Sequence, residues 1–427
     1  MGEGFYTIGP CGEELLSAVG LVLAPSDPVA LHYRHLATQI ARHSRELALD
    51  DPADTSNLVP LLLDRARGYV LSAKDPVTGG AHCALGGGAQ DYLVTSTLAS
   101  QSSPAVGRAL APGIMKHTLE LPSTASSKGG AGLVSYASLG DGSVNNGHFL
   151  SAANLAAYAS HRGFKCPVLF GISDNDLCIS LKGVPGWIDN FSSRLGFRVF
   201  SCDGSSLADV FRATRAAVDT SKTTQVLTSS CLKTRKGNTP SLCWFVRWLF
   251  GWLVGWLPTA AARRTGRPAA LLFRNLPRRF GHAATDRQTA YMTQQEVDAL
   301  ASSNPLEAAC AAAVAEGIVD YPTLSAMFDG VGARTLAAFQ EAATEPKLET
   351  LGVGNLVARN APPLAEPSPS TSNTMLLPSS IPLEPTPKKT SGNRRDVLRK
   401  HMNRAIGESL ETHQNMVYIG EDVEHGG

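Results

Sequence analysis

The stretch SLGDGSVNNGHF, residues 138–149, places a single carboxylate, Asp141, between two glycines. The apolar run before it, residues 132–137, predicts a buried strand, and residues 147–161 predict a helix. Asp141 would therefore lie on a tight turn at the carboxyl end of a strand, where open α/β sheets bind their ligands. The flanking glycines would let the backbone approach such a ligand closely.

The rest of the chain predicts strands that alternate with helices. Further apolar runs that read as strands cover residues 166–172, 195–200 and 268–273. A helix is expected at about 206–220, residues 293–345 read as Ala-rich helices, and residues 1–125 read as mixed helix and loop. This alternation indicates an α/β fold with a mostly parallel sheet flanked by helices.

Composition narrows the class of protein. The chain has 427 residues, enough for two or three domains of about 150 residues each. A net charge of +1 favours neither nucleic acid nor an anionic membrane as a bulk partner. The 8 cysteines form no C-x-x-C pair, which predicts buried free thiols in a reducing compartment. No signal peptide or Arg-rich presequence opens the chain, so we expect it to begin inside a domain.

One apolar stretch does not fit the α/β pattern. Residues 242–257 read LCWFVRWLFGWLVGWL, with tryptophans every four residues on what would be one helix face. The run is shorter than the roughly 20 residues of a membrane span, and Arg247 interrupts it. An interfacial membrane helix is one interpretation. We favour the other, in which residues 234–267 are an insertion or a translated non-coding segment between a helix and the next strand.

A second polar turn, Ser173-Asp174-Asn175-Asp176, follows the next predicted strand. Adjacent parallel strands would bring Asp141 and Asn175 to the same edge of the sheet. A carboxylate, an amide oxygen and a backbone carbonyl suit Mg²⁺, which also keeps phosphate oxygens and so could bridge the protein to a diphosphate. The alternative is that Asp141 only caps the helix that begins near Gly147.

The order of these features, GDG, a helix and strand, and then an Asn-containing turn, resembles the thiamine-diphosphate binding motif. Most of the chain resembles the decarboxylating first component of 2-oxoacid dehydrogenase complexes, of the branched-chain 2-oxoacid (favoured) or pyruvate type. Residues 1–345 resemble its alpha subunit, a thiamine-diphosphate-binding fold. Residues 346–392 are expected to be a Pro/Ser/Thr-rich linker. Residues 393–427 resemble the start of the beta subunit, a truncated pyrimidine-binding domain with a helix and a strand at 416–419.

The resemblance implies a metal and cofactor site around the GDG turn. Asp141, Asn175 and the carbonyl of Leu177 would bind Mg²⁺, with Gly140 and Gly142 beside the cofactor.

Other segments would complete the cofactor site by the same resemblance. Tyr33 and Arg34 would contact thiamine diphosphate, with Arg34 on the diphosphate, because a guanidinium fork matches phosphate oxygens. Ser96 and Leu98 would touch the cofactor, and Leu98 would support the bent arrangement of its rings. His282 would be a catalytic histidine that hydrogen-bonds the cofactor phosphate or the acyl intermediate.

Two further features are implied less directly. His82 resembles a second catalytic histidine of the family. A potassium site of the branched-chain members would comprise Thr95, Thr97, Ser100 and Gln101. An ordinary turn rich in Ser and Thr is the alternative interpretation of the latter residues.

The sequence departs from the family pattern in three ways. The segment between GDG and the Asn turn is several residues longer than usual. Ser173 stands where branched-chain members have an arginine on the diphosphate, so weaker cofactor affinity is expected. Ala283 stands where animal members carry a regulatory phosphoserine, which excludes phosphorylation at that position.

The implied function is oxidative decarboxylation of a 2-oxoacid, with acyl transfer to a lipoyl group on the acyltransferase core of a multienzyme complex. The family's base glutamate lies in the beta half beyond residue 427, so this chain alone is expected to be inactive. A dimer of fused chains is the expected assembly, in a mitochondrial matrix or plastid if eukaryotic and in the cytoplasm if bacterial. The alternatives are a transketolase-like thiamine enzyme and a non-catalytic remnant or assembly partner.

Overall fold

The computed structural model describes residues 8–46, 59–79, 81, 83–87, 90–118, 133–179, 181–189, 196–219, 266–283, 286–348 and 398–412. The chain divides into two compact units, Met1–Pro362 and Pro363–Gly427. The tryptophan-rich run at 242–257, the predicted linker 346–392 apart from its first three residues, and the predicted strand at 416–419 lie outside the described residues. In the second unit, the described part is helix α15 (Leu398–Thr412).

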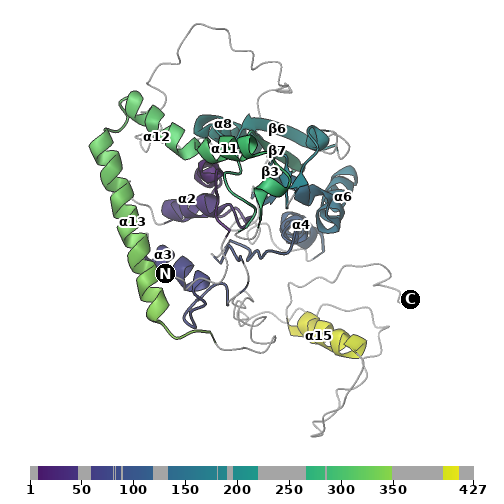
Figure 1. Ribbon diagram of the computed structural model, residues 1–427. Coiled ribbons are helices and arrows are strands. Elements are labelled where there is room, and N and C mark those ends of the chain that lie inside the picture. Colours follow the sequence, from purple (N-terminus) through teal and green to yellow (C-terminus); the bar gives the residue numbers. More distant parts are fainter. Residues whose placement is uncertain are drawn as a thin grey trace, which may run out of the picture. The chain divides into compact units, whose positions relative to one another are not determined.

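A five-stranded parallel sheet forms the centre of the first unit, in the order β1-β2-β3-β7-β6 (Figure 1). Its strands are β1 (Val29–Ala30), β2 (Ser135–Gly140), β3 (Val168–Ser173), β6 (Arg198–Asp203) and β7 (Ala269–Arg274). The short antiparallel pair β4 (Leu177–Cys178) and β5 (Leu181–Lys182) follows β3. The predicted α/β class with a mostly parallel sheet is therefore confirmed.

The strands begin one to three residues later than predicted, and β1 was not predicted. The run at 132–137 becomes Ser135–Gly140, and the run at 195–200 becomes Arg198–Asp203. Apolar runs mark burial, whereas strand pairing continues into polar residues: Gly140, for example, pairs with Ser173. Strand β1 is only two residues long, too short for any periodicity to indicate it.

Several helices begin after a residue whose side chain caps them. Asn146 caps α6 (Gly147–His161), Thr293 and Glu296 form a capping box on α11 (Gln294–Ser302), and Asn304 caps α12 (Pro305–Ala315). The other helices are α1 (Ser17–Val22), α2 (Leu36–Glu46), α3 (Val59–Tyr69), α4 (Ser102–Thr118), α8 (Leu207–Asp219) and α13 (Tyr321–Thr344). Short 3₁₀ turns are η1 (Glu14–Leu16), η3 (Asp141–Asn145) and η6 (Gln288–Ala290).

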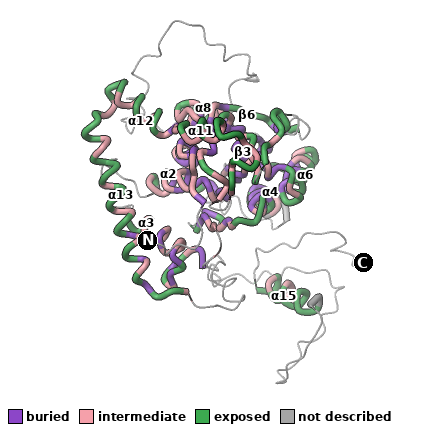
Figure 2. The backbone as a smooth tube through the Cα atoms, viewed as in Figure 1, coloured by how far each residue is buried: buried purple, intermediate pink, exposed green. Residues whose placement is uncertain are grey.

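Helices cover both faces of the sheet, which makes three layers (Figure 1). Successive residues of β2 show the two sides: Ala137 belongs to a core that includes residues of α4 and α6, and Tyr136 to a core that includes residues of α1 and α8. Strand β3 is buried along its whole length, as its apolar sequence predicts (Figure 2).

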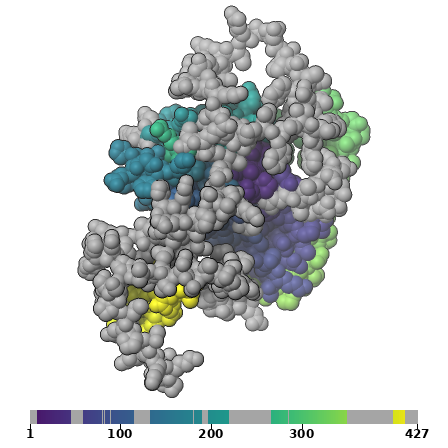
Figure 3. All heavy atoms as spheres, turned by 180° about the vertical axis from the view of Figure 1, so that it is seen from behind, coloured from purple at the N-terminus to yellow at the C-terminus, as the bar shows by residue number. Residues whose placement is uncertain are grey.

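A smaller cluster joins α3 to α13, in which Ala66 and Val70 pack with Ala338 and Ala342. The two helices lie side by side in Figures 1 and 3. No helix among the described residues is long and apolar enough to cross a membrane. The six described cysteines are free thiols, but only Cys166 and Cys202 are buried, so the prediction of buried thiols is confirmed for those two and wrong for the other four.

Candidate functional site

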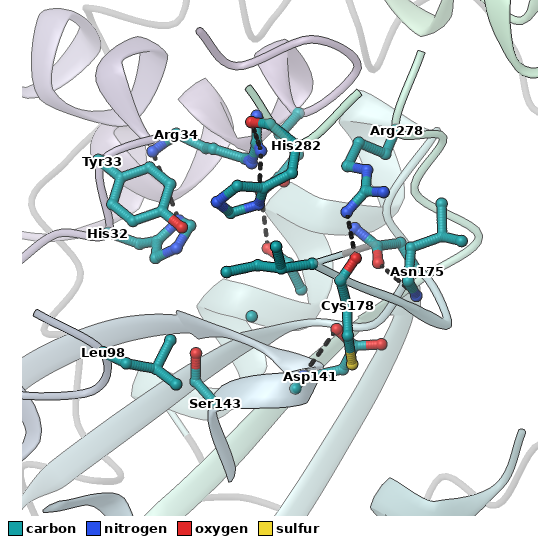
Figure 4. Close-up of a pocket in the computed structure, with 16 residues that line it drawn as sticks. His32, Tyr33, Arg34, Leu98, Asp141, Ser143, Asn175, Cys178, Arg278 and His282 are labelled. Carbon is teal, nitrogen blue, oxygen red and sulfur yellow. Dashed lines mark hydrogen bonds between the residues drawn. The ribbon is translucent and has the colours of Figure 1, made fainter. Parts of the chain in front are cut away.

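A cavity of about 270 Å³ opens at the carboxyl edge of the sheet (Figure 4). Its lining residues come from segments distant in sequence, and they are Glu13, His32, Tyr33, Arg34, Leu98, Gly140, Asp141, Gly142, Ser143, Ser173, Asn175, Leu177, Cys178, Ile179, Arg278 and His282. The set includes most of the residues that the sequence singled out for the cofactor and the metal.

The GDG turn leads directly from β2 into the 3₁₀ turn η3. Asp141 is 8% exposed, and its carboxylate accepts a hydrogen bond from the backbone N–H of Gly142 at 2.9 Å. The cap of α6 is a different residue: Asn146 Oδ1 accepts from the backbone N–H of His148 at 2.9 Å. The interpretation of Asp141 as a helix cap is therefore wrong, and its carboxylate lines the cavity instead.

The second polar turn meets the first, as parallel pairing predicts. Carboxylate oxygens of Asp141, Asp174 and Asp176 lie within 4.8 Å of one another, an arrangement that could hold a metal ion. Burial and the charges of the other two aspartates raise the pKa of Asp141 to about 7. A cation at this position would lower that pKa, because it stabilises the ionised carboxylate.

The predicted ligands Asn175 and Leu177 also line the cavity. Asn175 Oδ1 accepts a hydrogen bond from the backbone N–H of Leu177 at 3.0 Å, which closes the turn on itself. Between them, Asp176 has a left-handed backbone with φ of 55°, a conformation that is strained for a residue with a side chain. Asp174 and Asp176 were visible in the sequence but were not predicted as part of the acidic cluster.

Cationic and aromatic groups form another wall. Arg34 is 4% exposed; its Nη1 donates to the carbonyl of Gly9 at 3.0 Å and its Nη2 to the carbonyl of His282 at 2.7 Å. Its guanidinium lies 5.8 Å from the ring centroid of Tyr33. The ring of Tyr33 lies edge-on to that of His282, with the centroids 6.2 Å apart. These contacts hold Arg34 against the loop that carries His282 (Figure 4).

The His282 loop is fixed by a buried network. The backbone N–H of His282 donates to Asp286 at 2.7 Å, and Tyr291 Oη donates to the same carboxylate oxygen at 2.8 Å. Burial and the positive charges of Arg34 and Arg278 lower the pKa of His282 to about 4. The imidazole is therefore neutral at pH 7 and can accept or donate one hydrogen bond at the cavity wall.

Arg278 is a cavity residue that the sequence analysis did not select. It is 3% exposed, and it donates to the carbonyl of Cys178 at 2.9 Å and to Tyr291 Oη at 2.6 Å. Its buried Nε has no hydrogen-bond partner. An arginine in the run RRFGH is no signal by itself; only the packing of the loop on β4 brings it to the cavity.

A buried polar cluster around Glu13 was also missed. Ser173 Oγ donates to Glu13 Oε2 at 2.7 Å, and His35 Nε2 lies 3.0 Å from the same oxygen. Burial alone would raise the pKa of Glu13, but the hydrogen bond with His35 and nearby cationic groups outweigh it and lower the pKa to about 2. Ser173, noted as a departure, thus binds a carboxylate of the cavity wall. His32, a further lining residue, has a pKa held well below its usual value by burial.

The other residues predicted for the cofactor and potassium sites lie in the turn before α4, except His82, which is not among the described residues. Leu98 lines the cavity, whereas Ser96 is exposed and is not among the lining residues. In the predicted potassium site, the hydroxyls of Thr95 and Thr97 are 3.4 Å apart. Gln101 donates to the carbonyl of Ser138, and its buried Oε1 has no partner. The remaining potassium residue, Ser100, donates its backbone N–H to the carbonyl of Thr97.

Comparison of the sequence with protein-family models gives no match, and comparison with curated proteins gives none either. The interpretation of the cavity therefore depends on its own residues and on the motifs that first indicated them.

Proposed function

We propose that this chain binds thiamine diphosphate with Mg²⁺ and acts as the cofactor-binding part of a 2-oxoacid dehydrogenase first component. The observation that carries the proposal is the convergence of the motif residues in one cavity. Tyr33, Arg34, Asp141, Asn175 and His282 come from separate segments, and all of them line it. Motifs chosen from the sequence alone would have no reason to meet if they served unrelated purposes.

The chemistry of the donors fits a metal diphosphate. Arg34 and Arg278 are buried cations that line the cavity and would meet the diphosphate, and the unpartnered Nε of Arg278 has donor capacity left. Asp141 and the amide oxygen of Asn175 supply hard oxygen ligands for Mg²⁺, with the carbonyl of Leu177 as a third candidate. Gly142 lets the GDG turn pack closely against β4, because a Cβ there would lie 2.8 Å from Cys178 Sγ.

The chain's own residues would bind and orient the cofactor. Arg34 is pre-positioned by three contacts and need not reorganise to meet a phosphate. Neutral His282 can hydrogen-bond a phosphate oxygen or a reacting acyl group without adding charge. Leu98 offers an apolar surface to the rings. The bound thiazolium would supply the electron sink for decarboxylation of the 2-oxoacid.

The proposal extends to partners by the same resemblance. A beta-subunit-like half would supply the rest of the site, a lipoyl-bearing acyltransferase would accept the acyl group, and a dimer would be the working assembly. A branched-chain 2-oxoacid is the favoured substrate.

Calorimetric titration of the purified chain with thiamine diphosphate in the presence of Mg²⁺ tests the proposal. Wild type should bind, and Asp141→Asn should lose at least tenfold in affinity, about 1.4 kcal/mol, because the only carboxylate of the proposed ligand set is gone. Asp298→Asn, a change of the same charge on exposed α11, is the matched control and should bind as wild type does. Equal affinity for wild type and Asp141→Asn, or no binding by either, would contradict the proposal.

A further inference from the structure

The imidazole of His282 meets a side chain that can only donate hydrogen bonds. Arg34 Nη2 lies 3.4 Å from His282 Nδ1 and 2.7 Å from the carbonyl oxygen of the same residue. One Nη2 carries two protons, so it can serve both acceptors at once. Because a guanidinium stays charged and offers no lone pair, the lone pair of the side-chain contact has to come from Nδ1.

Both partners of this contact are held by other groups. Arg34 is buried, and its Nη1 donates to the carbonyl of Gly9 at 3.0 Å. The backbone N–H of His282 donates to Asp286 at 2.7 Å, and the ring of Tyr33 lies edge-on to the imidazole. A proton on Nδ1 would therefore place an N–H against a buried cation that is already fixed by two carbonyls. The geometry disfavours that tautomer.

The other ring nitrogen, Nε2, faces a different environment. Burial and the positive charges of Arg34 and Arg278 hold the pKa of His282 at about 4, so the ring carries one proton at pH 7. With Nδ1 as an acceptor, that proton is on Nε2. No described residue is hydrogen-bonded to Nε2, and the ring projects toward the middle of the lining residues (Figure 4). The cavity therefore receives an N–H donor whose direction is set by the wall behind it.

We propose that Arg34 is a positioning residue that fixes the Nε2–H tautomer of His282, so that His282 meets the ligand as a hydrogen-bond donor to a negatively charged oxygen and not as a base. The inference rests on the proposed function for the identity of that ligand, whose phosphate would supply the oxygen. A nitrogen that already carries its proton has no lone pair with which to remove one from the ligand. His282 therefore recognises negative charge together with Arg34 and Arg278, and any proton abstraction has to use another group.

Nuclear magnetic resonance of the cofactor-free chain, labelled with ¹⁵N in its histidines, tests the tautomer directly. The chemical shift of each ring nitrogen reports whether that nitrogen carries a proton, and the spectrum of His282→Gln identifies the His282 signals among the 11 histidines. At pH 7, wild type should show a protonated Nε2 and a bare Nδ1. Arg34→Met should show a mixture of both tautomers, because nothing then prefers a bare Nδ1. The exposed His161 is the control, and its signals should be the same in both proteins.

Two spectra would overturn the inference. A protonated Nδ1 in wild type would reverse the direction of the contact, and a pure Nε2–H tautomer in folded Arg34→Met would show that Arg34 does not set it. If Arg34→Met does not fold, the wild-type spectrum still decides, because signals averaged between the two tautomers would mean that no group fixes the ring.

Calorimetric titration with thiamine diphosphate and Mg²⁺ tests the consequence for binding. His282→Gln keeps an N–H donor, and its amide oxygen can accept from Arg34, so its affinity should stay within about threefold of wild type. His282→Met is of similar length but has no donor, and it should lose about tenfold. His161→Met, at the exposed end of α6, is the matched control and should bind like wild type.

Equal affinities for His282→Gln and His282→Met would contradict the donor role. If wild type itself does not bind the cofactor, the proposed function fails, whereas the tautomer of His282 and its dependence on Arg34 are still decided by the spectra of the cofactor-free chain.

Discussion

Removal of the Asp141 carboxylate is expected to stabilise the metal-free protein at neutral and alkaline pH. Burial and two neighbouring aspartates raise the pKa of Asp141 from 3.8 to about 7. An acid whose pKa is raised by folding favours the folded state below its unfolded pKa, and this advantage is lost as pH rises through the folded pKa. Ionised Asp141 therefore destabilises the fold above pH 7 when no cation is present.

The size of this destabilisation follows from the shift in the pKa of Asp141. A shift of roughly three pKa units means that wild type loses about 4 kcal/mol of folding stability between pH 3.8 and pH 7. Asparagine has nearly the same shape and cannot ionise, so the stability gained by Asp141→Asn should grow by about 3 kcal/mol between pH 5 and pH 8. At pH 8, Mg²⁺ at one hundred times its dissociation constant should stabilise wild type by about 2.7 kcal/mol and leave the variant unchanged.

The assay is urea unfolding followed by far-ultraviolet circular dichroism, at pH 5 and pH 8, with EDTA and then with Mg²⁺. Asp298→Asn on exposed α11 controls for the loss of one negative charge and should show no such pH dependence. A stability difference between Asp141→Asn and wild type that stays constant across this range would refute the reasoning. It would mean that the carboxylate is solvated and does not face an acidic, ion-binding turn.

Three further changes test the packing that supports the cavity. Glu13→Gln should lose about 3 kcal/mol of stability at pH 7, because the folded pKa of Glu13 is about 2. That contribution is present above pH 4.5 and fades as the pH falls toward 2, so the stability difference between wild type and variant in chemical denaturation should fall to about 1.4 kcal/mol at pH 3. Tyr136→Phe should raise the unfolding free energy by about 1 kcal/mol, since the buried hydroxyl has no partner, and unchanged or lower stability would contradict this. Arg42→Met should cost about 3–5 kcal/mol in the same assay, because it removes the arginine partner of the buried Asp91 carboxylate, which keeps only His43, and the donors of the carbonyls that Arg42 binds; a loss below about 1 kcal/mol would show that water replaces them.

The sequence predicts those parts of the fold and site that depend on local pattern. Residues 147–161 form α6 with the expected bounds, because Asn146 and the following glycine mark its start. Asp141 and Asn175 line the same cavity because the turns that carry them follow two strands that are parallel neighbours. The spacing of apolar residues and the residue types in the turns are enough to predict this helix and the place of these two turns.

The parts that were missed depend on contacts between distant segments. Glu13 meets Ser173 across 160 positions of sequence, and nothing near either residue indicates the other. Arg278 is an ordinary basic residue until its loop packs on the turn at Cys178. Buried charges of this kind are recognised only when their partners are known, because the same residue types are usually found on the surface.

The electrostatics of the cavity narrow the kind of ligand that can occupy it. The turns after β2 and β3 gather carboxylates, whereas other walls of the cavity carry the buried guanidiniums of Arg34 and Arg278. An anion alone would meet the guanidiniums but be repelled by ionised Asp141, and a cation alone would be attracted by the aspartates but weakened by the nearby arginines. A metal ion bound to a phosphate-bearing ligand satisfies both walls at once, so each partner should strengthen the binding of the other by the same factor. This requirement for paired opposite charges follows from the side chains alone, and it is the physical reason that a metal diphosphate fits this cavity better than a free acid or a free metal ion does.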